Sequence, residues 1–328
     1  MENIVGFEGV GISPFLMDRI AFSIGSFDIY WYALIITVGL ILAVLFCMWQ
    51  AKKFDLTVDN ILDVLLFGLP VGVICARAYY VIFQWDQYES FAEMVNIRDG
   101  GLAIYGGVIG AFVTGYIYCR IKKVNLLAMF DIASLGFLIG QSIGRWGNFV
   151  NGEAYGGVTD LPWGMTINGY GPYHPTFLYE SLWNVVGFVL LFIFAKKWMK
   201  HHGEVFFLYF AWYGLGRFFI EGLRTDSLYL GPVRISQILA AVFCLAGVAL
   251  FVLSRKGFIR KVQDKIVDRA VKKQQAYKPI YTPLLQNNDP ALGGASVEQL
   301  TEGDTASETD SDSNEDISRE IEKEERDG

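Results

Sequence analysis

The stretch from Gly144 to Gly157 reads GRWGNFVNGEAYGG and closes a long apolar run of the chain. It holds one arginine, two asparagines and one glutamate within nine residues, at Arg145, Asn148, Asn151 and Glu153. A charged side chain costs about 2.5–3.5 kcal/mol at the centre of a membrane, so it is kept there for pairing or for function. This density of polar groups at the end of a membrane-length segment indicates that the stretch forms the centre of an active site.

The composition of the 328 residues favours a polytopic membrane protein over two soluble domains. Hydrophobic residues make up 53% of the chain and charged residues only 19%, and the mean hydropathy is +0.34. Seven segments are long enough to span about 30 Å of hydrocarbon as helices. They cover residues 30–49, 60–83, 103–121, 125–147, 176–196, 204–222 and 233–254. The predicted fold class is an all-α polytopic membrane protein with seven transmembrane helices.

The net charge of −7 belongs to the C-terminal tail and not to the membrane part. From Tyr281 onward the chain has fourteen acidic and three basic residues, which leaves 20 acidic and 24 basic residues in 1–280. We therefore predict a seven-helix membrane domain over 1–256 and a basic amphipathic juxtamembrane segment over 257–273. Residues 274–328 are predicted to form an acidic, disordered cytoplasmic tail.

Basic residues in the short loops predict the orientation of the helices. They follow the first, third, fifth and seventh segments, whereas the loops after the second and fourth are acidic or nearly uncharged. The basic residues are Lys52, Lys53, Arg120, Lys122, Lys123, Lys196, Lys197, Lys200, Arg255, Lys256, Arg260 and Lys261. Because basic loops stay in the cytoplasm, the N-terminus is expected outside and the C-terminus inside.

This orientation brings polar side chains from all seven segments to the outer membrane face. They include Tyr32, Arg77, Tyr105, Arg145, Glu153, Glu180, Arg217, Glu221, Arg224 and Gln237. Three guanidiniums, those of Arg77, Arg145 and Arg217, lie on the side where basic residues are disfavoured. Glu153 and Glu221 can pair with two of them at most. A phosphate bound bidentately is a natural third partner, and a phospholipid headgroup of the outer leaflet supplies one at this depth.

Other interpretations stay open for single residues. Arg217 and Glu221 are spaced i, i+4, so they could simply neutralise each other on one helix face. Glu180 could be a satisfied interhelical acceptor, and Tyr32 and Tyr105 could be interfacial aromatics. A membrane transporter would also retain buried charges, but the inner halves of segments one, five and seven are nearly devoid of polar residues. A non-catalytic scaffold would not explain the arginines.

The motifs of this chain resemble those of bacterial prolipoprotein diacylglyceryl transferases. GRWGNFVNGEAYGG agrees at every fixed position with the family pattern G-R-x-G-N-F-x-N-x-E-x-x-G. WYALIITVGL, GGLAIYGGVIGA, HPTFLYE and YGLGRFFIEGLRTD extend the agreement, in the family's order, over roughly residues 10–256. The resemblance implies a seven-helix enzyme of the bacterial plasma membrane, with its active site toward the outer leaflet.

The resemblance also implies a reaction and its partners. Such an enzyme transfers the diacylglyceryl group of phosphatidylglycerol to the thiol of the lipobox cysteine in a prolipoprotein signal peptide. A thioether forms and glycerol phosphate is released. No metal, organic cofactor or nucleic-acid partner is implied. The four cysteines of this chain lie far apart without a CxxC pair, which also argues against a metal or disulfide framework.

The resemblance marks the residues expected to act in catalysis or to bind the lipid headgroup, the latter including Asn148, Gly156 and Tyr32. They are Arg145, Asn148, Glu153 and Gly156 in the signature, Arg217 and Glu221 in segment six, and Tyr32 in segment one. To these we add Arg77 and Asn151 as headgroup ligands. The chain departs from the family at Tyr105, where many members have a histidine that has been assigned as the general base. A phenol is a poor general base at neutral pH, so the base is elsewhere or Tyr105 acts by hydrogen bonding.

The expected mechanism is a displacement at the glycerol carbon that carries the phosphate. It needs a thiolate and a stabilised leaving group. Arg145 and Arg217 are predicted to hold the leaving phosphate, with Asn148 and Tyr105 donating further hydrogen bonds. The glutamates of the signature and of segment six would orient the two arginines. Glu153 is also the candidate to accept the thiol proton.

Overall fold

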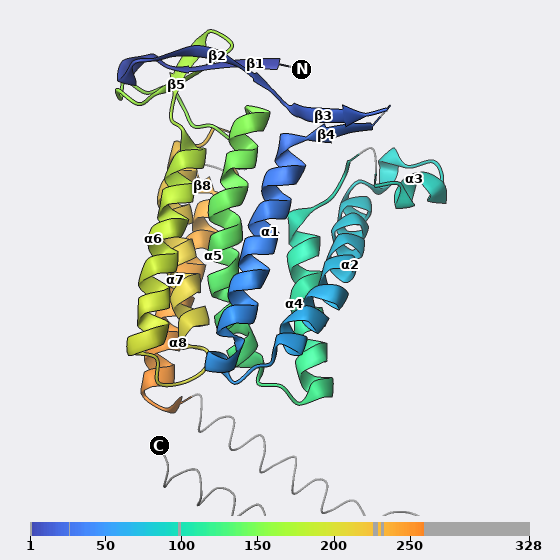
Figure 1. Ribbon diagram of the computed structural model, residues 1–328, viewed down its shortest axis with the longest axis vertical. Helices are drawn as coiled ribbons and strands as arrows, with labels where there is room; N and C mark the ends of the chain where they lie inside the picture. Colours follow the sequence, from blue (N-terminus) through green and yellow to red (C-terminus); the bar gives the residue numbers. More distant parts are fainter. Residues whose placement is uncertain (1, 26, 98–99, 226–228, 231–232, 259–328) are drawn as a thin grey trace, which may run out of the picture. The chain divides into compact units, whose positions relative to one another are not determined.

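Seven long helices dominate the computed structural model, which describes residues 2–25, 27–97, 100–225, 229–230 and 233–258 (Figure 1). They are α1 (Trp31–Gln50), α2 (Val58–Phe83), α4 (Ile104–Lys122), α5 (Leu126–Asn151), α6 (Thr176–Lys197), α7 (Glu204–Leu223) and α8 (Ile235–Arg255). Shorter turns are η1 (Glu8–Val10), η2 (Ala51–Phe54), η3 (Trp85–Gln87) and α3 (Phe91–Val95). Each of the seven predicted segments coincides with a long helix to within a few residues. The predicted acidic tail, and nearly all of the predicted basic segment, lie outside the described residues.

Six of the long helices are apolar and long enough to cross a membrane: α1, α2, α4, α5, α6 and α8. The chain is therefore a mostly helical, multi-pass membrane protein. Helix α7 has a similar length of 20 residues but is not among the six. It carries Arg217 and Glu221 among its last residues, and both lower its hydropathy. A seventh transmembrane span at α7 stays a prediction.

The expectation of an all-α protein is confirmed only in part, because the chain is mostly helical but also forms β-strands. β1 (Glu2–Phe7), β2 (Ile12–Asp18), β5 (Met165–Ile167) and β6 (Tyr170–Tyr173) form an antiparallel sheet in the order β2-β1-β5-β6. Two hairpins pair β3 (Ile20–Ile24) with β4 (Phe27–Tyr30), and β7 (Tyr229–Leu230) with β8 (Val233–Arg234). The strands of the sheet are short, and β1 pairs with a strand about 160 residues further along the chain, at Val5 and Ile167.

The sheet and the basic residues lie at opposite ends of the helices. Figure 1 shows β1, β2 and β5 at the end where α1 begins and α5 ends. The other end carries Lys52 and Lys53 in η2, Arg120 and Lys122 in the last turn of α4, and Arg255 in the last turn of α8. The orientation in the membrane stays a prediction, and it would place the sheet on the outer side.

Two apolar clusters flank a polar layer along the central helices. The larger cluster lies toward the basic end and includes Ile132, Leu135 and Val205. The smaller one lies beneath the sheet and includes Val5 and Phe177. Between them, α5, α6 and α7 carry polar side chains that face one another. The apolar packing on both sides fixes the three helices around this polar layer.

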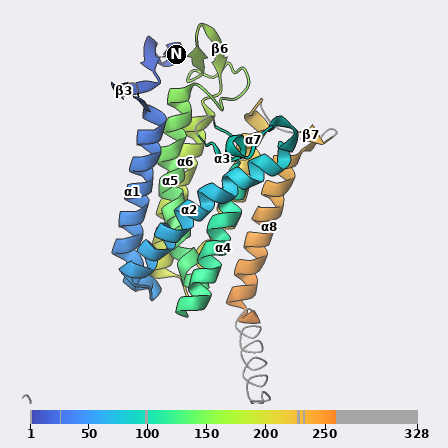
Figure 2. The same ribbon diagram turned by 90° about the vertical axis from the view of Figure 1, so that its right-hand side faces the viewer.

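Helices α2 and α4 form a second packing unit beside α5. Figure 2 shows α2 crossing α4 obliquely, and the two are in close contact. Gly106 and Gly110 of α4 allow this approach, since a Cβ at Gly106 would lie 2.3 Å from the carbonyl oxygen of Cys75. The backbone N–H of Ala103 donates to the carbonyl of Ala76, which ties the start of α4 to α2.

Candidate active site

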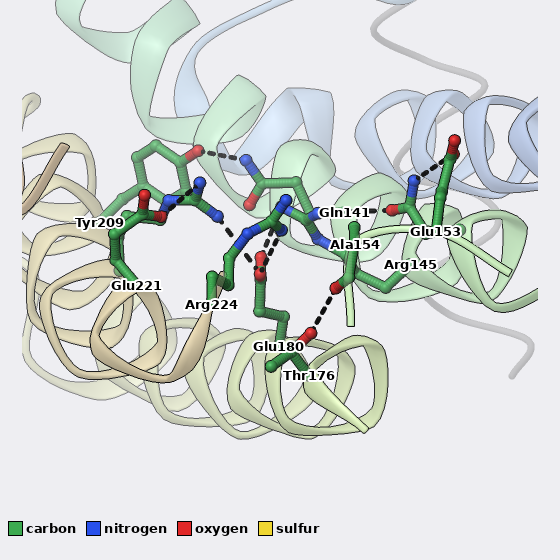
Figure 3. Close-up of polar contacts among 11 residues, drawn as sticks. Gln141, Arg145, Glu153, Ala154, Thr176, Glu180, Tyr209, Glu221 and Arg224 are labelled. Atoms are coloured by element: carbon green, nitrogen blue, oxygen red, sulfur yellow. Dashed lines mark hydrogen bonds and ion pairs between the residues drawn. The ribbon is translucent and has the colours of Figure 1, made fainter. Parts of the chain in front are cut away.

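Glu180 of α6 forms ion pairs with three arginines. Its carboxylate lies 2.5 Å from Nη2 of Arg145 on α5, 3.2 Å from Nη1 of Arg217 on α7, and 3.7 Å from Nη1 of Arg224 just after α7. The side chain of Glu180 is only 8% exposed. Figure 3 shows Arg145 and Arg224 reaching this carboxylate. A buried carboxylate with these partners holds the guanidiniums in place.

Glu221 completes what we call the Glu180 cluster: Arg145, Glu180, Arg217, Glu221 and Arg224. Its carboxylate lies 2.7 Å from Nη2 of Arg217 and is 2% exposed. The predicted i, i+4 pair therefore forms. Arg217 also contacts Glu180, so the pair is more than an intrahelical neutralisation. The guanidinium of Arg234 donates to the backbone carbonyl of Glu221.

The depth of the cluster follows from its place on the helices. Arg145 lies six residues before the last residue of α5, and Glu180 lies four residues after the first residue of α6. At 1.5 Å per residue, both are about 6–9 Å inside the helix ends. The cluster is thus about one to two turns below the sheet side of the bundle.

A tryptophan pair keeps α6 and α7 in register beside the cluster. The rings of Trp183 and Trp212 stack with centroids 4.3 Å apart. Each indole N–H donates to the backbone carbonyl of the other tryptophan, at 3.1 Å. Gly187 and Gly216 make room for the rings, since a Cβ at either glycine would lie 2.2 Å from an indole nitrogen. This packing sets Glu180 of α6 opposite Arg217 of α7.

The signature stretch ends α5 and forms a short hydrogen-bonded chain. Nη1 of Arg145 donates to Oδ1 of Asn148 at 3.3 Å. The side-chain amides of Asn148 and Asn151 donate to Oε1 of Glu153, at 2.9 and 3.2 Å. Gly152 has a φ of 63° and ends the helix in the left-handed conformation, which turns the chain back toward Asn148.

Among the residues that the structure describes, no arginine contacts Glu153 directly, contrary to its predicted role. Glu153 is an exposed carboxylate that is linked to Arg145 through Asn148. Glu180 takes the orienting role instead. The sequence did contain a signal for this, because Glu180 is the one acidic residue of the apolar segment 176–196.

The structure gives Gly156 a packing role. Its N–H donates to the carbonyl of His174 at 2.9 Å, so the amide is already engaged. A Cβ at this position would lie 2.7 Å from Cβ of His174 and 2.8 Å from the carbonyl oxygen of Leu223. Gly156 also pairs with Arg224 in an isolated β-bridge. It therefore joins the loop after α5 to the end of α7, next to the cluster.

Tyr32 and Tyr105 lie outside the Glu180 cluster. The ring of Tyr32 packs against Gly147 of the signature, where a Cβ would come within 2.8 Å of it. Tyr105 is 56% exposed in the first turn of α4, and its ring centroid lies 6.4 Å from that of Tyr79. Within the described residues, no hydrogen bond joins either phenol to the cluster.

The structure does not place Arg77 as a phosphate ligand. This corrects the earlier inference, in which a phosphate was needed because three arginines outnumbered two glutamates. Its guanidinium donates to four backbone carbonyls, of Glu93, Met94, Gly100 and Gly101, at 2.7–3.0 Å. The rings of Tyr80 and Tyr88 lie against it. Arg77 thus fastens the segment between α2 and α4, in a pocket separate from the Glu180 cluster.

Arg145 and Arg217 line a narrow cleft in which the cluster is accessible. Gln141, Glu180 and Tyr213 also line it. The side chains of Arg145 and Arg217 are 24% and 23% exposed, so each guanidinium is held by Glu180 and still partly accessible. Two guanidiniums fixed side by side by a carboxylate provide charged donors suited to a phosphate or carboxylate.

The helices and the cluster define a multi-pass membrane protein with a charged site between its transmembrane helices. The sequence profile of the family described as prolipoprotein diacylglyceryl transferase matches residues 19–253. The chain belongs to this family.

Curated relatives support the same assignment. The chain is 47% identical over 242 residues to the phosphatidylglycerol–prolipoprotein diacylglyceryl transferase of Clostridioides difficile, an alignment that covers 73% of this chain and 97% of the relative. It is 48% identical over 245 residues to the protein of the same name from Finegoldia magna, covering 74% and 98%. Identity to the Bacillus cytotoxicus protein of that name is 42% over 253 residues, covering 73% and 93%.

Proposed function

We propose that this protein transfers the diacylglyceryl group of phosphatidylglycerol to the thiol of the lipobox cysteine of a prolipoprotein. The reaction forms a thioether, releases glycerol phosphate and is the first step of bacterial lipoprotein maturation. Family membership and the names of the relatives support the activity. The observation that supports the site assignment is that Arg145 and Arg217 contact the two oxygens of the Glu180 carboxylate and line one cleft.

The two arginines suit the leaving group of this reaction. Attack by the thiolate forms the S–C bond, and the electrons of the breaking C–O bond pass to the phosphate oxygen. Negative charge therefore develops on glycerol phosphate. Arg145 and Arg217, already fixed by Glu180, are positioned to stabilise that charge without reorganisation. The low dielectric of the helix bundle strengthens this interaction relative to water.

The thiol proton needs an acceptor, and Glu153 is our candidate. It is an exposed carboxylate at the mouth of the site, linked through Asn148 to Arg145. Asn151 donates to the same oxygen, Oε1, so the other oxygen is left for a proton. Tyr105 is assigned a hydrogen bond to the lipid phosphate, because its exposed phenol lies in the first turn of α4 on the sheet side of the bundle.

We place the site toward the outer leaflet, with α7 as a seventh membrane span, the N-terminus outside and the C-terminus in the cytoplasm. Basic residues at the end opposite the sheet support this orientation. Helix α7 packs against both α6 and α8, which supports a span despite its charges. Glu221 and Arg217 neutralise each other within the bundle, and this pairing lowers the cost of inserting α7.

The described residues give no specific support to the alternative that this protein is a membrane transporter. Buried acidic residues do occur at the basic end, but local contacts account for them. Asp131 accepts from the backbone N–H groups of Gly203 and Phe206 at the start of α7. Glu204 lies 2.8 Å from Nε of Arg255. The apolar cluster around Ile132 and Leu135 separates these groups from Glu180.

The test is a reconstituted reaction. Purified protein is incubated with phosphatidylglycerol and a lipobox peptide, and the peptide mass is followed. We expect the mass of a diacylglyceryl thioether on the cysteine peptide and no change on a matched peptide with serine at that position. Absence of the adduct with a folded, lipid-embedded protein would refute the proposal.

A further inference from the structure

Gln141 lies on α5 one helical turn before Arg145 and lines the same cleft. Residues four apart on a helix are neighbours, with Cβ atoms about 6 Å apart. The side chain of Gln141 is therefore next to the guanidinium that we assign to the phosphate, on the side away from the sheet. Figure 3 shows Gln141 between Tyr209 and the Glu180 cluster.

Only one end of the Gln141 amide is used. Its Nε2 donates to the hydroxyl of Tyr209 at 2.9 Å, which fixes the side chain. Its Oε1 is buried and has no hydrogen-bond partner among the residues that the structure describes. Buried acceptors are nearly always satisfied, and leaving one unpaired is unfavourable. An unpaired acceptor in the wall of a polar cleft therefore points to a donor on the ligand.

We propose that Oε1 of Gln141 accepts a hydrogen bond from a hydroxyl of the headgroup glycerol of the lipid donor, and that it thereby selects a polyol headgroup. The inference rests on the proposed function, since it assumes that Arg145 and Arg217 hold the lipid phosphate. The headgroup hydroxyls of phosphatidylglycerol lie a few bonds from the phosphorus. A side chain one turn from Arg145 is within that reach.

The charges of the cleft favour a hydroxyl over an ammonium group at this position. Arg145 and Arg217 repel a cation, and the carboxylates of Glu180 and Glu221 are already paired with arginines. The neutral amide oxygen of Gln141 is left to accept a hydrogen bond. An uncharged donor meets no repulsion there, whereas an ethanolamine headgroup would bring its charge beside the guanidiniums.

The test compares two lipids on two proteins. Dioleoyl phosphatidylglycerol is compared with dioleoyl phosphatidylpropanol, which has the same phosphate and acyl chains but no headgroup hydroxyl. Each lipid is tested as the diacylglyceryl donor to a lipobox peptide. A lipid that is converted slowly is tested as a competitor of the other lipid. The variant is Gln141→Met, which keeps the length of the side chain and loses the acceptor. We expect kcat/KM with phosphatidylglycerol to fall about tenfold and the value for phosphatidylpropanol to stay within about twofold.

Tyr209→Phe is the matched control, because it removes the partner of Nε2 and keeps the acceptor Oε1. This control variant should change kcat/KM for the two lipids by the same factor. Gln141→Asn provides a second variant that keeps the amide and withdraws the oxygen by one methylene, with the same expected loss of preference. An equal fall for both lipids, or an unchanged preference in either Gln141 variant, would overturn the inference. If the wild-type protein converts neither lipid, the proposed function fails and the inference falls with it.

Discussion

Replacing Glu180 with glutamine keeps the shape of the side chain and removes the charge that holds Arg145 and Arg217. The carboxylate is 8% exposed and contacts the two guanidiniums at 2.5 and 3.2 Å, so solvent cannot replace it. Removing one partner of a buried ion pair costs about 3–5 kcal/mol. Because glutamine keeps one neutral hydrogen bond, we expect the cost of this substitution to be at the low end, about 3 kcal/mol. If both arginines must be fixed to stabilise the leaving phosphate, this corresponds to about a 100-fold loss in kcat/KM.

The assay needs a control that separates the site from general stability. Glu204→Gln is matched, because Glu204 is also a buried glutamate and lies 2.8 Å from an arginine, Arg255, at the other end of the bundle. Both variants are purified in phosphatidylglycerol-containing detergent micelles, and their thermal unfolding and thioether formation are measured. We expect both to lower the unfolding temperature. Only Glu180→Gln should lower the rate per folded molecule.

A Glu180→Gln protein with activity within about threefold of wild type would refute this reasoning. It would mean that Glu180 is a structural acceptor between α6 and α5, one of the interpretations that the sequence leaves open. An equal loss of activity in Glu204→Gln would point to the same conclusion, since the effect would then come from the fold and not from the site.

Three further substitutions test other parts of the account. Arg145→Lys keeps the charge but cannot reach both Glu180 and Asn148, so we expect about a 100-fold lower kcat/KM; a near-wild-type rate of thioether formation would exclude the phosphate role. Tyr105→Phe removes an exposed hydroxyl, so it should leave the unfolding temperature unchanged and lower kcat about tenfold; a fully active enzyme removes Tyr105 from the chemistry. Gly156→Ala forces a Cβ to within 2.8 Å of two neighbours and should cost about 1–3 kcal/mol of stability, which an unshifted unfolding temperature would contradict.

The helices were predictable from the sequence because each is a membrane-length segment and six of them are strongly apolar. The strands were not, since their pairing is long-range. Val5 pairs with Ile167, and no local pattern in a six-residue strand specifies a partner so far away. The sheet is held by a small apolar cluster that includes Met17 and Met165, two residues that lie far apart in the sequence.

The sequence predicted which residue types form the site. It was less successful at predicting which of these residues contact one another. Comparing the number of arginines with the number of carboxylates led to the prediction that Arg77 binds a phosphate. In the structure, four backbone carbonyls accept the hydrogen bonds of its guanidinium. Such a count omits the backbone, whose carbonyls are equally good acceptors in an irregular loop. Glu153 was also predicted from the sequence to orient an arginine. Helix packing instead brings Glu180, 35 residues away, to 2.5 Å from that arginine.

The central claim is that diacylglyceryl transfer and release of glycerol phosphate are one reaction at the site of Arg145 and Arg217. The most direct measurement quantifies both products, thioether peptide and glycerol phosphate, in a single reaction of the purified protein with phosphatidylglycerol and a lipobox peptide. The account predicts equal amounts of the two and a parallel loss of both in Arg145→Lys. Release of glycerol phosphate without thioether, or neither product from a folded protein, would contradict it.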